Sequence, residues 1–332
     1  MKKDFGNVIT AMVTPFKADK DQSVDFEKGI TLANFLLQNG TDTLLLTGST
    51  GEDAQLTANE KWEFVKTIRQ NTPQSARIIV STGDTNTRRA IAKASQAFEV
   101  GADAILVSAP EYIKPTQQAM DIHFSAIAKA IFPHPMMIYN IPSRTGVEIL
   151  PKTVMSLAYS NSNIIGIKQS CADLNRISEM KAHHHSASLP DFQIYSGDDN
   201  LTLPMLALGA TGVVSVASHL EGRLIQQMIR EFKAGHTEQA LKIHQGLYPL
   251  FEALFMKTNP LSIKEALYQK GMIASPVLRT LGEMDSVDKN KLKSLLKIFD
   301  KPKRISRVPT SDEEFIQKKI AHLRWLESRL QR

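Results

Sequence analysis

The run Thr43-Leu44-Leu45-Leu46-Thr47, with the residues that follow it, decides the fold of this chain. Near-continuous apolar strands of this kind are typical of a parallel sheet, in which both faces of a strand are buried. A short turn follows, Gly48-Ser49-Thr50-Gly51-Glu52, and residues 57–70 then place apolar side chains at helical spacing. The segment therefore predicts one strand–helix unit of an α/β fold.

The same unit recurs along the chain. Eight candidate strands, each followed by a stretch with helical periodicity, cover residues 7–13, 43–47, 77–81, 104–108, 135–140, 163–168, 192–196 and 212–216. Eight units at this spacing predict a closed (β/α)8 barrel, the TIM barrel. An open, doubly wound sheet is the competing architecture, but it would usually carry a glycine-rich phosphate-binding turn after its first strand. This chain has Thr14-Pro15-Phe16 at that position.

The strand–helix alternation stops after the eighth strand, so the barrel is expected to cover residues 1–220. Residues 221–298 read as several helices with no strand between them, which predicts a C-terminal helical appendage. Residues 299–332 contain a basic linker, Lys301-Pro302-Lys303-Arg304, and an amphipathic helix expected to begin at Ser311. The apolar stripe of that helix consists of Ile316, Ile320, Leu323, Leu326 and Leu330.

The composition favours a cytoplasmic protein. The 332 residues, 42% of them hydrophobic, suffice for one large core, and the single cysteine, Cys171, excludes an internal disulfide. No apolar run reaches the roughly 18 residues that a membrane-spanning helix needs, and the first residues lack the apolar core of a signal peptide. Most of the net charge of +6 belongs to residues 297–332, with ten Lys/Arg against five Asp/Glu. We interpret that tail as a solvated charged helix and expect no nucleic-acid or membrane partner.

Functional residues of a barrel lie where its strands end, and Lys168 ends the sixth candidate strand. A lysine at the end of a buried strand is unusual, because charged groups are rarely buried without a partner. Burial disfavours the ammonium form, and a neutral amine can attack a ketone to form a Schiff base. The alternative is a lysine whose amine reaches solvent, and position alone leaves the two interpretations open.

Other strand ends carry side chains suited to the same chemistry. Tyr139 could move protons if Ser49, Thr50 or Tyr112 completes a relay of hydroxyls, although it could equally be a core aromatic. Arg144 follows the fifth candidate strand and could hold a carboxylate through two parallel hydrogen bonds, although an arginine there could also lie free on the surface.

Taken together, these segments resemble the dihydrodipicolinate synthase / N-acetylneuraminate lyase family of class I aldolase-type barrels. The resemblance covers residues 8–296 and rests on an ordered set of motifs rather than on any one of them. The motifs are Thr14-Pro15-Phe16, Gly48-Ser49-Thr50-Gly51-Glu52, Tyr139-Asn140-Ile141-Pro142, Gly166-Ile167-Lys168, Ser196-Gly197-Asp198-Asp199 and Asn259-Pro260.

The resemblance implies a role for each of these residues. Lys168 would form the imine with pyruvate, and Tyr139 would donate and accept the proton. Ser49 and Tyr112 would extend the relay, with Tyr112 supplied across a dimer interface. Substrate-binding positions implied by the resemblance are Thr50, Arg144, Val214 and Gly197, with Thr50 and the Val214 backbone holding the pyruvate carboxylate region.

The loop Ser143-Arg144-Thr145-Gly146 resembles the corresponding loop of those family members in which the arginine binds the carboxylate of aspartate semialdehyde. The implied reaction condenses pyruvate with aspartate semialdehyde to 4-hydroxy-tetrahydrodipicolinate, on the route to lysine and diaminopimelate. The resemblance implies a homodimer or homotetramer, and it implies no metal or organic cofactor. Two alternatives stay open: a related lyase acting on a sugar acid such as N-acetylneuraminate or on a hydroxy-oxo acid, and a non-catalytic interaction protein on the same fold.

The chain also departs from the family pattern. Ser49 replaces the usual threonine but keeps the hydroxyl. Lysine-inhibited members carry a tyrosine, a glutamate and a histidine at positions that match Glu111, Arg89 and Ala58 here. Because Arg89 would repel an α-amino group, we expect weak or absent inhibition by lysine. We interpret Asp198-Asp199 as structural, capping the helix that follows, rather than as catalytic.

Overall fold

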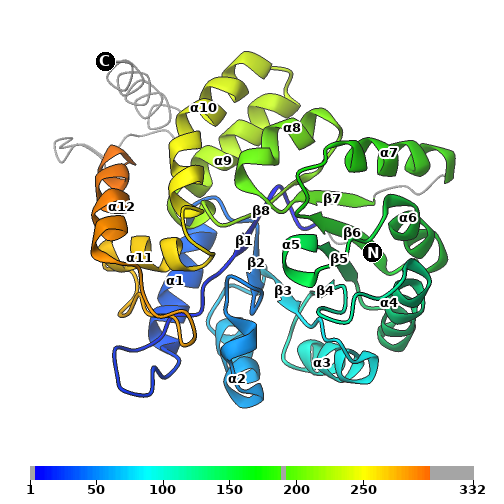
Figure 1. Ribbon diagram of the computed structural model, residues 1–332, viewed down its shortest axis with the longest axis horizontal. Helices are drawn as coiled ribbons and strands as arrows, with labels where there is room; N and C mark the ends of the chain where they lie inside the picture. Colours follow the sequence, from blue (N-terminus) through cyan, green and yellow to red (C-terminus); the bar gives the residue numbers. More distant parts are fainter. Residues whose placement is uncertain (1–3, 188–191, 300–332) are drawn as a thin grey trace.

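The computed structural model describes residues 4–187 and 192–299, in which eight parallel strands close into a barrel surrounded by helices (Figure 1). The strands are β1 (Val8–Ala11), β2 (Thr43–Leu46), β3 (Arg77–Ser81), β4 (Ala104–Ser108), β5 (Met136–Asn140), β6 (Ile164–Gln169), β7 (Gln193–Ser196) and β8 (Gly212–Ser215). Each strand pairs with the next along the chain, and β8 pairs with β1 to close the barrel. The predicted (β/α)8 barrel is confirmed.

Helices connect consecutive strands on the outside of the barrel. They are α1 (Phe26–Gln38), α2 (Ala58–Gln70), α3 (Thr87–Glu99), α4 (Gln117–Ile131), α6 (Pro151–Ser160), α7 (Asn175–Ala187) and α8 (Thr202–Ala207). Local chemistry sets where several of them begin. At α2, for example, the Thr57 side chain accepts from the backbone N–H of Glu60, and the Glu60 carboxylate accepts from that of Thr57. A short additional helix, α5 (Pro142–Thr145), follows β5 and carries Arg144.

The strands are apolar at successive positions because they face two cores. One core fills the barrel interior and contains Phe5, Ile9, Leu45, Leu106, Met137, Tyr139, Tyr195 and Val214. The other lies between the strands and the surrounding helices. Burial on both faces explains why Leu44 and Leu46 point to the outer core while Leu45 points inward.

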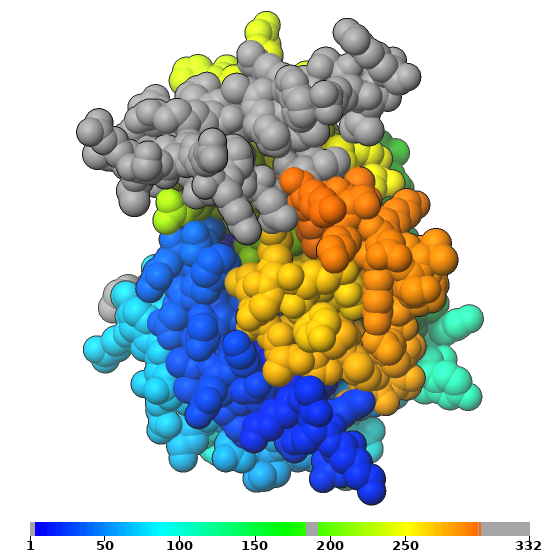
Figure 2. Space-filling model, turned by 90° about the vertical axis from the view of Figure 1, so that its left-hand side faces the viewer, coloured from blue at the N-terminus to red at the C-terminus, as the bar shows by residue number. Residues whose placement is uncertain are grey.

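Four helices follow β8: α9 (Ser218–Lys233), α10 (Thr237–Leu254), α11 (Leu261–Gln269) and α12 (Ser286–Phe299). Helix α9 packs against β1 and α10, and α11 lies beside α1 on the flank of the barrel (Figures 1 and 2). The segment between α10 and α11 reaches the mouth of the barrel, where Asn259 contacts Thr50. The division of the chain at residues 220 and 298 stays a prediction, and the helix predicted from Ser311 lies outside the described residues.

Membrane-spanning helices and metal-binding clusters are both missing from the part of the chain that the structure describes. No helix there is long and apolar enough to cross a membrane. Within the same residues, no group of three or more His, Cys, Asp or Glu side chains could hold a metal ion.

Candidate active site

Lys168 and Tyr139 lie side by side where β6 and β5 end. The two strands pair in a register that sets these residues opposite one another, and Lys168 is in turn opposite Tyr195 of β7. Both side chains are buried, with 7% of each exposed. The Lys168 Nζ lies 4.2 Å from the centroid of the Tyr139 ring. An amine is therefore held against the face of a phenol ring in a buried environment, and both side chains are of kinds that imine chemistry with proton transfer uses.

Two carboxyl groups from the β7–α8 loop lie near this amine. Burial raises the pKa of Asp198, and the positive charge of Lys168 partly opposes that rise. Burial also raises the pKa of Asp199, whose hydrogen bonds to Ser215 and to backbone amides act against it. Neither carboxyl group forms an ion pair with Lys168 among the described residues.

Asp199 has a structural role, but not the one predicted for it. Its carboxylate accepts from the Ser215 hydroxyl at 2.5 Å and from the backbone N–H groups of Val216 and Ala217 at 3.0 and 2.9 Å. Neither aspartate caps the next helix: Asp198 precedes the 3₁₀ turn Asp199–Leu201 without a side-chain cap, and α8 has no side-chain cap. The prediction of a cap on the next helix was wrong, because the fold brings the β8–α9 connection closer to this side chain than its own local helix.

The loop after β2 presents Ser49 and Thr50 to the mouth of the barrel. Two residues that flank them, Thr47 and Glu52, have left-handed backbone angles, with φ of +50° and +57°, so the chain folds back sharply here. The Thr14 hydroxyl donates to the carbonyl of Gly51 at 2.7 Å, which ties the loop after β1 to this turn. A conformational cost of this kind persists only where surrounding contacts hold the turn in place.

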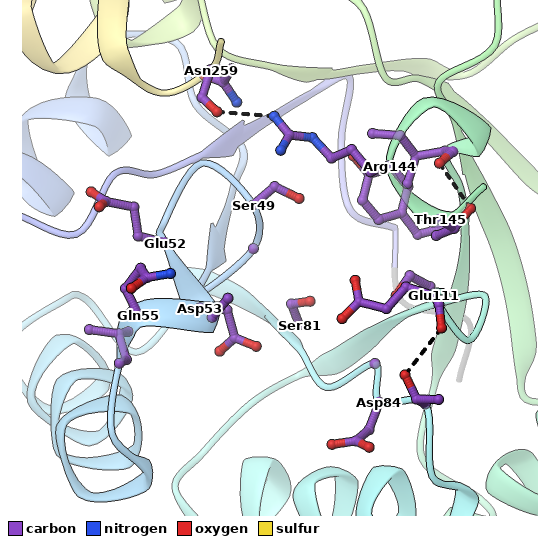
Figure 3. Close-up of a pocket in the computed structure, with 18 of the residues that line it drawn as sticks. Ser49, Glu52, Asp53, Gln55, Ser81, Asp84, Glu111, Arg144, Thr145 and Asn259 are labelled. Atoms are coloured by element: carbon purple, nitrogen blue, oxygen red, sulfur yellow. Dashed lines mark hydrogen bonds between the residues drawn. The ribbon is translucent and has the colours of Figure 1, made fainter. Parts of the chain in front are cut away.

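Asn259, in the connection between α10 and α11, joins two of the predicted site residues. Its side-chain amide donates to the Thr50 hydroxyl at 2.8 Å, and its backbone carbonyl oxygen accepts from Arg144 Nη2 at 3.0 Å. Figure 3 shows Arg144 and Asn259 reaching toward each other over the cavity. Asn259-Pro260 contributed to the resemblance as a motif, but nothing local in the sequence indicated that Asn259 would contact the site.

A cavity of about 840 Å³ opens between the loops that carry Ser49 and Arg144 (Figure 3). Ser49, Tyr139, Arg144 and Asn259 line it near the strand ends. Lys168 is not among its lining residues; its amine lies against the ring of Tyr139, which does line the cavity. The cavity therefore offers a substrate space in which Arg144 stands across from Ser49.

The far side of the same cavity is charged. Asp84 forms ion pairs with Arg89 and Lys93, each at 2.9 Å, and Glu111 lies nearby. Burial alone would raise the pKa of Asp84, but its hydrogen bonds to Arg89, the Asn86 backbone and Lys93 lower it to about 2. Asp84 is therefore ionised, and the positive charges of Arg89 and Lys93 already compensate its negative charge.

Four other predicted residues lie outside the cavity lining: Thr50, Val214, Gly197 and Tyr112. Thr50 is buried, with 3% of it exposed. Val214 is buried in the barrel interior and pairs with Ile9 of β1. Gly197 packs against Ser170 so closely that an added Cβ would come within 1.8 Å of its hydroxyl, which only glycine avoids. Tyr112 is 91% exposed and has a left-handed φ of +70°. A single copy of the chain thus does not bring Tyr112 to Tyr139.

The family model described as the Dihydrodipicolinate synthetase family matches residues 4–299. A 4-hydroxy-tetrahydrodipicolinate synthase from Nostoc punctiforme is 44% identical over 294 residues, which cover 89% of this chain and 98% of the relative. The crystal structure of DHDPS from Cyanidioschyzon merolae with lysine bound matches with a TM-score of 0.84 and 39% identity, covering 88% of this chain and 97% of that one. The 4-hydroxy-tetrahydrodipicolinate synthase from Methylacidiphilum fumariolicum SolV matches with a TM-score of 0.85 and 33% identity, covering 96% and 99%. By sequence and by fold, this chain belongs to the dihydrodipicolinate synthetase family.

Proposed function

We propose that this protein is a 4-hydroxy-tetrahydrodipicolinate synthase, a lyase that condenses pyruvate with L-aspartate 4-semialdehyde. The observation that carries the proposal is the buried Lys168 amine, which lies against the ring of Tyr139, a residue that lines the cavity. The names of the curated relatives, at 41–46% identity, support the same activity. A buried lysine beside a tyrosine also speaks against the alternative of a non-catalytic interaction protein.

The chemistry follows from these groups. The Lys168 amine adds to the keto carbon of pyruvate, and loss of water gives a protonated imine. The imine draws electrons from the neighbouring methyl carbon, which loses a proton and becomes an enamine nucleophile. The enamine carbon then bonds to the aldehyde carbon of the second substrate, whose oxygen takes up a proton. The α-amino group of that substrate then attacks the imine carbon and displaces the Lys168 amine, which closes the ring and frees the protein. The Tyr139 hydroxyl moves the protons of these steps, with Ser49 and Thr50 as the neighbouring hydroxyls.

Arg144 is the residue that we assign to the second substrate. It lines the cavity, and its bond to the Asn259 carbonyl uses one of its two terminal nitrogens. A guanidinium at this place suits the carboxylate of aspartate semialdehyde, with which it can form two parallel hydrogen bonds. A sugar acid or a hydroxy-oxo acid would meet the same arginine, so the choice of aldehyde has to be measured directly.

The proposal is tested by coupling pyruvate consumption to a panel of aldehydes that includes aspartate semialdehyde, N-acetylmannosamine and short hydroxy-aldehydes. We expect kcat/KM for aspartate semialdehyde to exceed the others by about 100-fold or more, because the wrong partners leave the buried polar groups unpaired. Pyruvate forms the same imine in every case, so trapping alone does not separate the candidates. A preference for the sugar would favour the N-acetylneuraminate alternative instead.

We further propose that the protein acts as a homodimer or homotetramer in the cytoplasm and needs no cofactor beyond the imine on Lys168. The exposure of Tyr112 supports an oligomer, since 91% of this large side chain faces solvent in one copy of the chain. In a dimer of the kind the resemblance implies, Tyr112 would be buried beside the relay of the second copy. Relatives differ in this respect, because one solved structure is described as a monomeric dihydrodipicolinate synthase variant.

Lysine is expected to inhibit weakly or not at all. Arg89 lines the charged side of the cavity and stays positive, and the carboxylate nearest to it, Asp84, is already paired. An α-amino group approaching this wall meets repulsion from Arg89. The relative from Cyanidioschyzon merolae, whose structure has lysine bound, provides the positive control.

The measurement is a steady-state assay at subsaturating pyruvate with lysine titrated. Arg89→Glu serves as the matched variant, and it should increase sensitivity to lysine if the charge is the cause. Strong inhibition of the unmodified protein at low lysine concentration would contradict the prediction.

A further inference from the structure

Lys264 of α11 forms a buried ion pair with Glu52 of the β2 loop. The Lys264 Nζ lies 2.6 Å from Glu52 Oε1, and the two side chains are 0% and 4% exposed. The amine also donates to the carbonyl of Val277 at 3.2 Å and lies 4.2 Å from the centroid of the Phe16 ring. The appended helices therefore insert one fully buried charge directly beneath the loop that carries Ser49 and Thr50.

Such a pair is a poor device for stability alone. Removing two charges from water costs several kcal/mol, and apolar replacements of similar size are often as stable or more so. Burial raises the pKa of Glu52 and lowers the pKa of Lys264. In each case the opposite charge of the partner reduces the shift but does not cancel it. Glu52 Oε2 has no hydrogen-bond partner with good geometry among the described residues, although the backbone N–H and the charge of Arg279 also lower the pKa of Glu52. A buried pair can, however, specify one geometry.

The geometry in question is that of the 48–52 turn. Glu52 is at its end with a left-handed φ, and its N–H donates to the Ser49 carbonyl at 3.2 Å. On the opposite side of the ion pair, the backbone N–H of Lys264 donates to the carbonyl of Pro260 at 3.0 Å. This is the bond of the first turn of α11, so Lys264 lies one helical turn after the segment whose Asn259 donates to the Thr50 hydroxyl.

We propose that Lys264 is a positioning residue of the active site: by pairing with Glu52 it fixes the 48–52 turn against the α10–α11 segment and so sets the direction of the Thr50 hydroxyl. Two interactions join the turn to that segment, the hydrogen bond from Asn259 to Thr50 and the ion pair of Lys264 with Glu52. When the ion pair is removed, the turn shifts relative to Asn259, and the hydroxyl leaves the place where it meets pyruvate. This inference rests on the proposed function, which makes pyruvate the substrate held there.

The test compares Lys264→Met, Glu52→Gln and the double variant in the full chain. Each single variant leaves one buried charge without its partner, so its melting temperature should fall clearly. The double variant removes both charges and should regain much of that stability. If the pair is purely structural, the double variant should regain activity together with stability. If the pair positions the turn, the double variant should regain stability but not activity.

Two measurements decide between the interpretations. One is the rate constant for trapping pyruvate with borohydride, normalised to the number of chains that can be trapped, and the other is the KM for pyruvate. In the double variant we expect the rate constant to fall, and the KM to rise, by about 10- to 100-fold, since misplacing a binding group by 1 Å can cost that much. Because the rate is normalised to trappable chains, partial unfolding does not imitate the effect. An unchanged rate constant and KM in the double variant would overturn the proposal, whatever its melting temperature.

Lys233→Met is the matched control. Lys233 is also a lysine of the appended helices that holds a barrel segment, since it donates to the carbonyl of Thr211 at 2.9 Å. That hydrogen bond lies at the opposite end of the barrel, so its removal should lower the melting temperature without changing the trapping rate. If the unmodified protein itself traps no pyruvate, the proposed function fails. If the unmodified protein and the double variant trap pyruvate equally well, only the positioning role of Lys264 fails.

Discussion

Lys168→Ala is expected to abolish the trapped pyruvate adduct and to lower kcat by about 1,000-fold or more, as loss of a covalent nucleophile does in other enzymes. The reason is chemical: alanine has no amine, and the neighbouring Tyr139 cannot replace it. Lys168→Arg should be as inactive, although it keeps a positive charge, because a guanidinium does not form an imine under these conditions. The measurement is the intact mass of the protein after pyruvate and borohydride, followed by steady-state kinetics.

The fold should survive this change. No hydrogen bond or ion pair to Lys168 Nζ is found among residues 4–187 and 192–299, so its removal leaves no hydrogen-bond partner unpaired; Asp198 and Asp199 lose only a nearby positive charge. Lys152→Ala, on an exposed position of α6, is the control and should keep the adduct. An adduct of equal yield on the Lys168→Ala protein would show that another lysine forms the imine.

Arg144→Ala is expected to raise the KM for aspartate semialdehyde by about 100-fold or more while imine formation with pyruvate stays largely intact. Two charge-assisted hydrogen bonds, each contributing about 1.5–3 kcal/mol, would be missing from the complex with the second substrate. The stability of the fold should change little, because Arg144 is exposed and, within the described residues, its side chain makes one hydrogen bond, to the Asn259 carbonyl. Stopped-flow trapping and steady-state titration of each substrate separate the two effects.

Arg144→Lys refines the same test. It keeps the charge but cannot form two parallel hydrogen bonds, so its KM should lie between those of the unmodified protein and Arg144→Ala. If both variants retain the original KM for the aldehyde, another residue holds that carboxylate, and the assignment of Arg144 is wrong.

Much of the barrel could be predicted from local sequence. The strands β3 and β4 have the predicted bounds, Arg77–Ser81 and Ala104–Ser108, because burial on both faces leaves short continuous apolar runs that turns interrupt. Lys168 and Tyr139 could be recognised because each is a polar group at the end of such a run. Strand order then placed them together through the pairing of β5 with β6.

The interactions that complete the site could not be predicted in this way. Asn259 and Thr50 are 209 residues apart, and Lys264 and Glu52 are 212 apart, so no local pattern connects them. In the sequence, Lys264 reads as one of the polar residues of an amphipathic helix, whereas its side chain is fully buried. Tyr112 is a different case, since its predicted role depends on a second copy of the chain.

The position of Asn259 has a consequence for the order in which the protein becomes an enzyme. Ribosomes make the eight strands before the α10–α11 segment, because Asn259 and Lys264 follow Ser215 in the chain. The residues that touch Thr50 and Glu52 therefore emerge after all eight strands. A nascent chain that ends before Asn259 lacks both contacts, so its substrate pocket is not yet complete.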